Sequence, residues 1–209
     1  KILCSAKKPM IYSGGGVILS KASKELIKLT KLLNYPITNT LMGLGAYPSS
    51  DNQFLGMLGM HGTYEANMAM HDCDVLLAVG ARFDDRVTGD TNQFCPKAKI
   101  IHIDIDPSSI SKIIEVDHFL IGDTKKILRK LTLFSSKYKK NINKAALEKW
   151  WKKIKSWQRK NCLSYKKSKE VIKPQSVIET LHTLSKGKSF VTSDVGQHQM
   201  WVAQYYKFD

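Results

Sequence analysis

Two arginines and two aspartates occur within five consecutive positions of the segment Gly80–Gly89. The segment directly follows the apolar run Val75–Val79, which has the composition of a buried parallel strand. Arginine is otherwise scarce, since only Arg129 and Arg159 add to these two and every other basic side chain apart from histidine is lysine. A guanidinium offers its donors as a planar fork that fits phosphate or carboxylate oxygens, and a lysine ammonium cannot replace it. The pattern therefore predicts an anion-binding loop.

An acidic residue ends the next apolar run, Ile100–Asp104. Asp104 follows the glycine after the previous strand by about two dozen residues, the offset of the acid that binds ribose hydroxyls in dinucleotide folds. The Asp106-Pro107 pair then stops the strand. One strand–helix–strand unit is therefore expected to hold the adenosine half of a dinucleotide, with Asp104 as ribose acceptor. The alternative is that Asp104 only forms a turn at the strand end.

Three consecutive glycines, Gly14-Gly15-Gly16, stand between a short apolar strand and a helical pattern. Without Cβ atoms their N–H groups can approach a diphosphate at a helix N-terminus, although a turn that needs positive φ would use the same residues. The segment does not spell G-x-G-x-x-G, and the next strand ends in Thr38-Asn39-Thr40 without an acid. A simple NAD site at the first strand is therefore disfavoured.

Two further loops carry a histidine close to glycine. In Gly59-Met60-His61-Gly62 the glycines would let a flat ring approach, and Met60 could pack on that ring. In Val195–Trp201, Gln197 and His198 follow another expected strand and could donate to a phosphate or a ring. Either histidine could instead be an ordinary loop residue.

An alternation of strands and helices must position these loops. We expect strands at residues 9–12, 36–40, 75–79, 99–104 and 119–123. The spacing of apolar residues predicts helices at 20–33, with Ser20 as the cap, and at 63–70, 108–113 and 124–134. This alternation is typical of a parallel, doubly wound α/β sheet, which binds ligands at the carboxyl ends of its strands.

The composition changes in the second half of the chain, where Lys, Asn, Trp and Ser become frequent and helices that pack on a neighbour are expected. Pro174 suits the first turn of a new helix over 175–184, and Ser189–Asp194 has the composition of a strand. We therefore expect a sheet domain at 1–135, a helical connection at 136–172, and the truncated start of a second α/β domain at 173–209.

Charge and cysteine content limit the classes of function. The formal net charge of +15 comes almost entirely from lysine, without aromatic–arginine interleaving, so we expect solvated surface and no nucleic-acid partner. Cys4, Cys73, Cys95 and Cys162 have no paired spacing, which favours reduced thiols in the cytoplasm over a zinc site. No apolar run approaches the ~20 residues of a membrane helix, so no membrane association is expected.

Together these segments resemble one family, the catalytic large subunits of acetolactate synthase, also called acetohydroxyacid synthase, and among them the bacterial forms. The likeness is carried by Leu58–Asn67, Gly80–Gly89, His102–Pro107 and Val195–Trp201. Their order and spacing match the family over nearly the whole chain outside residues 136–172, and the ten-residue loop is the most specific of them. The resemblance implies three α/β domains, of which this chain would supply the central FAD-binding domain and the start of the third, diphosphate-binding domain.

The resemblance also implies which residues bind cofactors. FAD, extended along the central domain and held without a redox role, would contact Gly14, Gly15, Gly16, Thr40, Leu41, Leu58, Gly59, Met60, His61, Gly80, Ala81, Arg82, Asp84, Arg86, Val87, Asp104, Ile105, Asp123, Thr124, Gln199 and Met200. Thiamine diphosphate would contact Val195, Gly196, Gln197 and His198. Some members carry Glu at the position of Asp104, a departure that should preserve the ribose role.

The implied activity is a transferase reaction of valine, leucine and isoleucine biosynthesis. It would condense two pyruvates to 2-acetolactate and CO2, or pyruvate with 2-oxobutanoate to 2-aceto-2-hydroxybutanoate, with thiamine diphosphate and Mg2+. The family implies a homodimer of large subunits with a small regulatory subunit. The Glu that activates thiamine and the Mg2+ ligands would lie outside these residues. We therefore expect no catalytic residue and no metal ligand here, and no activity from this stretch alone.

Three alternative functions stay open. Pyruvate oxidase and glyoxylate carboligase are FAD-containing thiamine-diphosphate enzymes with the same kind of sheet, although the Gly80–Gly89 loop favours acetolactate synthase. An NAD-dependent dehydrogenase or deacylase could bind its dinucleotide on the same kind of strand–helix–strand unit. A basic binding protein without catalysis would instead exploit the positive charge.

Overall fold

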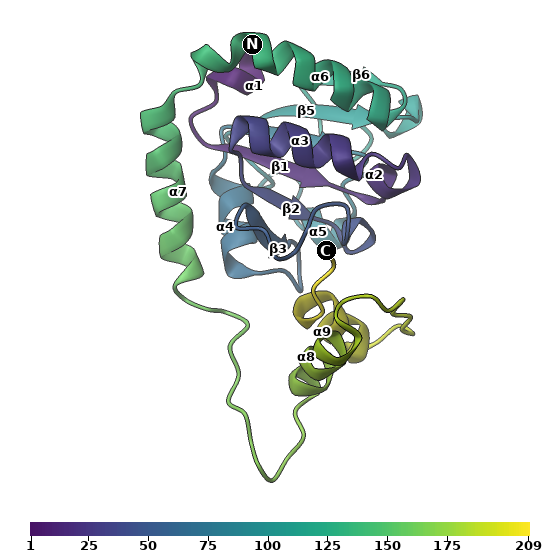
Figure 1. The fold of residues 1–209 in the computed structure, drawn as a ribbon. Coiled ribbons are helices and arrows are strands. Elements are labelled where there is room, and N and C mark those ends of the chain that lie inside the picture. The colour runs from purple at the N-terminus through teal and green to yellow at the C-terminus, as the bar shows by residue number, and fades with distance from the viewer.

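The structure is a computed structural model of residues 1–209 (Figure 1). In it, the apolar runs of the sequence form the strands of one parallel sheet. The order across the sheet is β3-β2-β1-β4-β5-β6. The strands are β1 (Pro9–Ser13), β2 (Ile37–Asn39), β3 (Phe54–Met57), β4 (Val75–Val79), β5 (Lys99–Asp104) and β6 (His118–Ile121). Every residue of β1 and β4 is buried, as expected for central strands covered on both faces. The predicted α/β class with a parallel sheet and flanking helices is confirmed.

Four long helices cover the sheet. α3 (Ser23–Leu33) joins β1 to β2, whereas α4 (Tyr64–Asp72) joins β3 to β4 in the opposite direction along the sheet. Because such crossovers are right-handed, α3 and α4 lie on opposite faces. α6 (Thr124–Tyr138) packs beside α3, and α7 (Lys144–Gln158) packs beside α4. On α3, Leu26, Leu29 and Leu33 recur at helical spacing and are buried in the core.

Two tryptophans fix α7 to the rest of the molecule. The indole Nε1 of Trp150 donates to the carbonyl of Pro9 at 3.0 Å, and the side chain is 2% exposed. Its ring meets that of Trp157 edge to face, with centroids 5.7 Å apart. On the more exposed side, Nε1 of Trp151 donates to the carbonyl of Asn34 at 2.9 Å, just after α3 ends. The Trp-rich segment thus packs on the amino end of β1.

An extended stretch follows α7 and leads to two helices, α8 (Pro174–Ser185) and α9 (Gln197–Tyr205), which pack together below the sheet in Figure 1. Pro174 is the first residue of α8, as predicted. The end of the chain returns to the sheet unit. The Phe208 carbonyl accepts from the amide of Ser49 at 3.0 Å. Gln204 Nε2 donates to the carbonyl of His61 at 2.9 Å.

Two predicted helices differ from the structure. The helix expected over 20–33 is two helices, because α2 (Gly15–Leu19) precedes α3. Ser20 is not the cap of the second helix; its hydroxyl donates back to the Val17 carbonyl, and Ala22 precedes α3. The helix expected over 108–113 is only the 3-10 turn Pro107–Ser109, since Ser111 has φ of +54° and interrupts any helix.

Two predictions about strands are also corrected. β3 was not expected, because its four residues include a glycine and lack the pattern of a longer apolar run. The strand expected at Ser189–Asp194 does not form, since a strand is defined by its partners and no other strand lies beside this segment.

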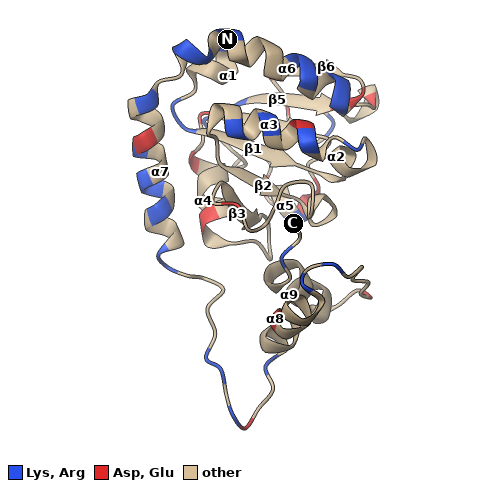
Figure 2. Ribbon diagram, viewed as in Figure 1, with Lys and Arg blue, Asp and Glu red and all other residues tan.

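The lysines are spread along helices and do not gather in one cluster. Figure 2 places many of them along α3, α6 and α7, and nearly all the lysines of these helices are exposed. This arrangement is typical of solvated helix faces. No helix of the structure combines the length and the apolar character needed to cross a membrane.

Trp150→Phe should destabilise the protein. The ring remains apolar, but the buried Pro9 carbonyl loses its indole donor, which should lower the free energy of unfolding by about 1–3 kcal/mol. Trp151→Phe is the matched control, because its indole makes the same kind of bond on the more exposed side of α7, and it should cost well under about 1 kcal/mol. Urea unfolding of both variants measures the difference, and equal losses would contradict the role given to Trp150.

Candidate functional site

The carboxyl edge of the sheet gathers most of the predicted site residues. Because all six strands are parallel, the loops that follow them leave the same edge. β1 and β4 are neighbours, but the chain continues from them toward opposite sides of the sheet, which makes this the point where an α/β sheet forms a binding crevice. The loops there carry Gly14–Gly16, Thr40–Leu41, Leu58–His61, Gly80–Val87, Asp104–Ile105 and Asp123–Thr124.

The glycines after β1 and β4 interlock backbone to backbone. A Cβ on Gly14 would lie 2.8 Å from Ala81 Cα, and one on Gly16 would lie 2.8 Å from Gly80 Cα. The Gly14 and Gly16 amides donate to the carbonyls of Val79 and Gly80 at 2.9 and 3.1 Å. These two glycines are therefore required for the packing of the two loops, and the phosphate contact expected of them stays a prediction. The Gly15 amide makes no hydrogen bond within the chain.

Asp84 organises the arginine loop. Its carboxylate accepts from the Arg86 amide at 3.2 Å, where it caps the short helix α5 (Asp85–Thr88), and from Arg82 Nη2 at 3.1 Å. The hydrogen bond from the Arg86 amide lowers the pKa of Asp84 most, and a hydrogen bond with Asp85 and the charges of Arg82 and Arg86 lower it further. The Arg82 side chain is 81% exposed, and Arg86 is exposed without an ion-pair partner. Both guanidinium groups are therefore exposed at the carboxyl edge of the sheet.

Asp104 and His102 lie one strand further along. One Asp104 oxygen accepts from the amide of Asp106 at 3.0 Å, and the other lies 3.6 Å from His102 Nε2. His102 is fully buried, and its Nε2 lies 2.8 Å from the Ala81 carbonyl. Burial lowers the pKa of His102 despite that carbonyl and Asp104, so the imidazole is neutral and the contact with Asp104 is not an ion pair. Nε2 therefore carries the proton that it donates to Ala81.

Buried polar atoms without partners mark the same edge. The Nδ2 of Asn39 and the Oγ1 of Thr40 are both buried, at the end of β2. Ser13, at the end of β1, donates its hydroxyl to the Oδ1 of Asn39 and leaves the amide nitrogen free. Unpaired buried donors are costly, so their presence beside the crevice fits a ligand that offers oxygen acceptors.

The loop after β3 is bound to the arginine loop. The Met60 amide donates to the Arg86 carbonyl at 3.0 Å, and a Cβ on Gly59 would lie 2.6 Å from that same carbonyl. Asn67 holds Gly59 from the other side, accepting from its amide and donating to its carbonyl. His61 is exposed. Sequence reasoning missed the role of Asn67, although its position as the fourth residue of α4, five residues after Gly62, was visible.

The remaining predicted residues are placed less centrally. Asp123 caps α6 by accepting from the Lys126 amide at 2.9 Å, so one of its oxygens has a structural role. Ile105 is exposed. Gln199 and Met200 are half-buried on α9, while Val195–His198 lie at the start of that helix. None of these residues makes a hydrogen bond to the loops of the sheet edge. From α9, only Gln204 makes such a bond.

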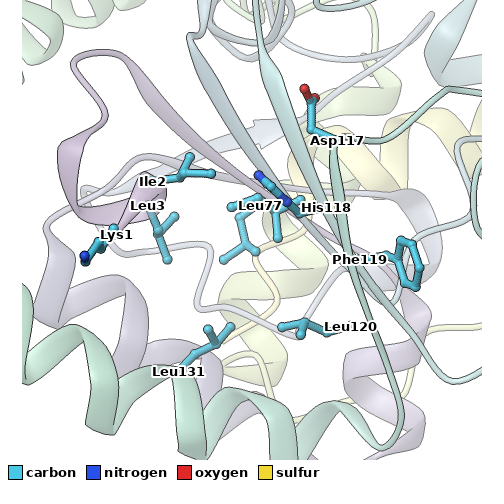
Figure 3. A pocket seen from close by; sticks show the side chains of 10 residues that line it. Lys1, Ile2, Leu3, Leu77, Asp117, His118, Phe119, Leu120 and Leu131 are labelled. Atoms are coloured by element: carbon cyan, nitrogen blue, oxygen red, sulfur yellow. The ribbon is translucent and has the colours of Figure 1, made fainter.

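A mostly apolar cavity lies elsewhere in the molecule. It has a volume of about 550 Å³ and is lined by Ile2 and Leu3 of the short helix α1 (Ile2–Ser5), by Leu77 and Ile101 of the sheet, and by Leu131 of α6 (Figure 3). Asp117 and His118 place it near the amino end of β6, away from the loops described above. A smaller cavity of about 200 Å³ lies between the His61 loop and α9.

No group of three or more His, Cys, Asp or Glu is arranged to hold a metal ion.

Comparisons with known proteins agree with this geometry. The family model "Thiamine pyrophosphate enzyme, central domain" matches residues 1–131. An acetolactate synthase large subunit of Haemophilus influenzae is 51% identical over 210 residues, covering 100% of this chain and 36% of that protein. The large subunit of acetolactate synthase isozyme 3 of Escherichia coli K12 is 49% identical over 207 residues, covering 99% and 36%.

A third relative, the acetolactate synthase large subunit of Buchnera aphidicola subsp. Schlechtendalia chinensis, is 53% identical over 209 residues, covering 99% of this chain and 36% of that protein. The chain thus spans little more than a third of the length of the curated relatives it matches. The family model covers well over half of the chain, with all six strands and the loops at their carboxyl ends. The chain therefore belongs to the thiamine pyrophosphate enzyme family, matching its central domain.

Proposed function

We propose that the chain is the FAD-binding central part, with the beginning of the C-terminal part, of an acetolactate synthase large subunit. The single observation that carries this proposal is about 50% identity to proteins of that name along the whole chain. Residues 1–135 would form the central domain, 136–172 the helical connection and 173–209 the start of the C-terminal domain. The whole protein would condense two pyruvates to 2-acetolactate and CO2, or pyruvate with 2-oxobutanoate.

The residues at the carboxyl edge fit an extended dinucleotide. At the crevice between β1 and β4, the free amide of Gly15 and the exposed guanidinium groups of Arg82 and Arg86 suit a diphosphate. Beside them, the unpaired Asn39 amide and Thr40 hydroxyl supply further hydrogen-bond donors. The six loops supply contacts along the edge of the sheet, which matches a ligand that is long and carries polar groups at intervals.

Asp104 suits the ribose of the adenosine half. It ends β5, next to β4, and only one of its oxygens accepts a backbone amide. The other oxygen can accept from a sugar hydroxyl, the role that an acid at this position has in dinucleotide folds. Gly122 follows β6, and its amide donates to the Asp104 carbonyl at 2.9 Å. This hydrogen bond joins the carboxyl ends of β5 and β6.

The proposed thiamine diphosphate contacts lie at the start of α9. Gly196 has φ of +156°, and a Cβ there would lie 2.8 Å from the His198 ring, so the turn favours glycine. Val195, Gln197 and His198 are exposed and open to a ligand or another domain. When bound, thiamine diphosphate supplies the electron sink for decarboxylation and carbon–carbon bond formation. Mg2+ would be held by residues outside this stretch.

The proposed partners follow from the names of the relatives. A large subunit implies a small regulatory subunit, and we propose a homodimer of large subunits as the core of the assembly. All four cysteines are free, which supports a reducing compartment such as the cytoplasm.

The protein that contains this chain should form 2-acetolactate and CO2 from pyruvate when supplied with thiamine diphosphate, Mg2+ and FAD, without consuming O2. The 209-residue stretch alone should form none, because its relatives are nearly three times as long. Product analysis measures the 2-acetolactate formed by each protein, and an oxygen electrode measures O2 consumption. Stoichiometric O2 consumption with acetyl phosphate as product would instead establish a pyruvate oxidase, and acetolactate from the isolated stretch would contradict the proposed division of the site.

Arg82→Lys should weaken FAD binding of the full-length protein roughly tenfold, which corresponds to about 1.4 kcal/mol, because the ammonium loses the fork geometry. Arg129→Lys is the matched control: Arg129 pairs with Glu25 between α6 and α3, so the same substitution should leave flavin affinity unchanged. Titration of the apoprotein followed by flavin fluorescence gives both constants. Equal affinities of the two variants would argue against a phosphate contact at Arg82.

Gly14→Ala should abolish tight FAD binding and lower the free energy of unfolding by about 1–3 kcal/mol, since the new methyl group meets the backbone of Ala81. Gly15→Ala tests the specificity of this effect, because its methyl group would meet Met42 at 3.3 Å and should cost less than about 1 kcal/mol. Thermal unfolding and flavin titration of both variants measure whether Gly14→Ala loses more stability and more FAD affinity than Gly15→Ala. A Gly14→Ala protein as stable as the wild type would contradict the interlock.

A further inference from the structure

Phe83 adopts an unusual conformation within the arginine loop. Its φ is +56°, a backbone region that bulky residues rarely occupy unless their surroundings hold them there. Its side chain is 2% exposed, although both neighbours, Arg82 and Asp84, point their charged groups to the surface. The loop thus turns one aromatic ring inward while it presents charge outward, and something beneath it must hold that ring.

The ring occupies a slot that the sheet register creates. Tyr12, Ala78 and His102 lie opposite one another on β1, β4 and β5, so their side chains share one face of the sheet. Ala78, in the middle, contributes only a methyl group and leaves room between the two larger rings. The Phe83 ring lies 5.8 Å from that of Tyr12 and 5.0 Å from that of His102, measured between centroids.

Two further contacts close the slot. Phe94 meets Phe83 edge to face at 5.9 Å, and Phe83 meets His102 at an interplanar angle of 71°, both favoured aromatic geometries. The His102 Nε2–H, in turn, donates to the carbonyl of Ala81 at 2.8 Å. The residue before Arg82 is therefore fixed by a buried hydrogen bond, and the residue after it is fixed by a buried ring.

We propose that Tyr12, Phe83, Phe94 and His102 form an aromatic lock that positions the arginine loop for its anionic ligand, with His102 and Phe83 as positioning residues that do not touch the ligand. This inference rests on the proposed function for the identity of that ligand, the diphosphate of FAD. The lock itself rests only on the contacts within the chain. It holds the loop from the core side, in addition to the Arg82–Asp84 contact at the surface.

Limited proteolysis tests the lock without any flavin. Trypsin cleaves after arginine, so mass spectrometry of the full-length protein can follow the rate of cleavage at Arg82 and Arg86. His102→Leu and Phe83→Leu should raise that rate at least tenfold, because the loop loses its buried anchors. His102→Gln, whose amide can still donate to the Ala81 carbonyl, should restore most of the protection. Cleavage in the exposed stretch around Lys166 and Lys167 gives the internal reference.

Trp150→Phe serves as the matched stability control, since it removes a buried donor at the amino end of β1 and leaves the lock intact. It should change neither cleavage at Arg82 and Arg86 nor FAD affinity, whereas His102→Leu and Phe83→Leu should weaken FAD binding at least tenfold. If His102→Leu does not fold, Phe83→Leu and His102→Gln carry the same comparison. Unchanged loop cleavage in Phe83→Leu, or no recovery with His102→Gln, would overturn the lock. Increased cleavage in a protein whose wild type binds no FAD would leave the lock standing and refute the proposed function.

Discussion

The loops after β1 and β4 meet backbone to backbone, and the geometry of the whole carboxyl edge depends on this contact. Gly14, Gly16 and Gly80 have no Cβ, so two adjacent parallel strands can end in loops that touch along their main chains. Any side chain at these positions would force the loops apart. The contact lies where the strand order reverses, so it shapes the crevice between the two halves of the sheet.

From that contact, backbone hydrogen bonds extend the order to the neighbouring loops. The Gly80 amide donates to the carbonyl of Ile103, the Met60 amide to that of Arg86, and the Thr40 amide to that of Ser13. Much of the main chain at the edge is thus hydrogen-bonded within the protein, and the groups left for a ligand include side chains and the Gly15 amide. The apolar core beneath supplies stability, while the loops supply recognition, a division that is common in α/β proteins.

The sequence predicted the parallel sheet and the gathering of the candidate residues at one edge of it, because long apolar runs and the loops after them leave clear signals. Val75–Val79 and the charged loop behind it could be recognised without the structure. The sequence could not reveal β3, whose four residues become a strand only through pairing with β2. Nor could it reveal His102 or Phe83 as anchors, because their partners come from strands that are adjacent in the sheet and distant in the chain. The glycine motif was located correctly, but its packing role depends on Gly80, some 65 residues away.

Hydrogen–deuterium exchange of the full-length protein, with and without FAD, tests the central claim that the carboxyl edge of this sheet is the flavin site. The account predicts that FAD protects the amides of peptides that contain Gly14–Gly16, Leu58–His61 and Gly80–Val87, and leaves the apolar cavity beside β6 unchanged. Protection centred on that cavity, with none at the three loops, would contradict it.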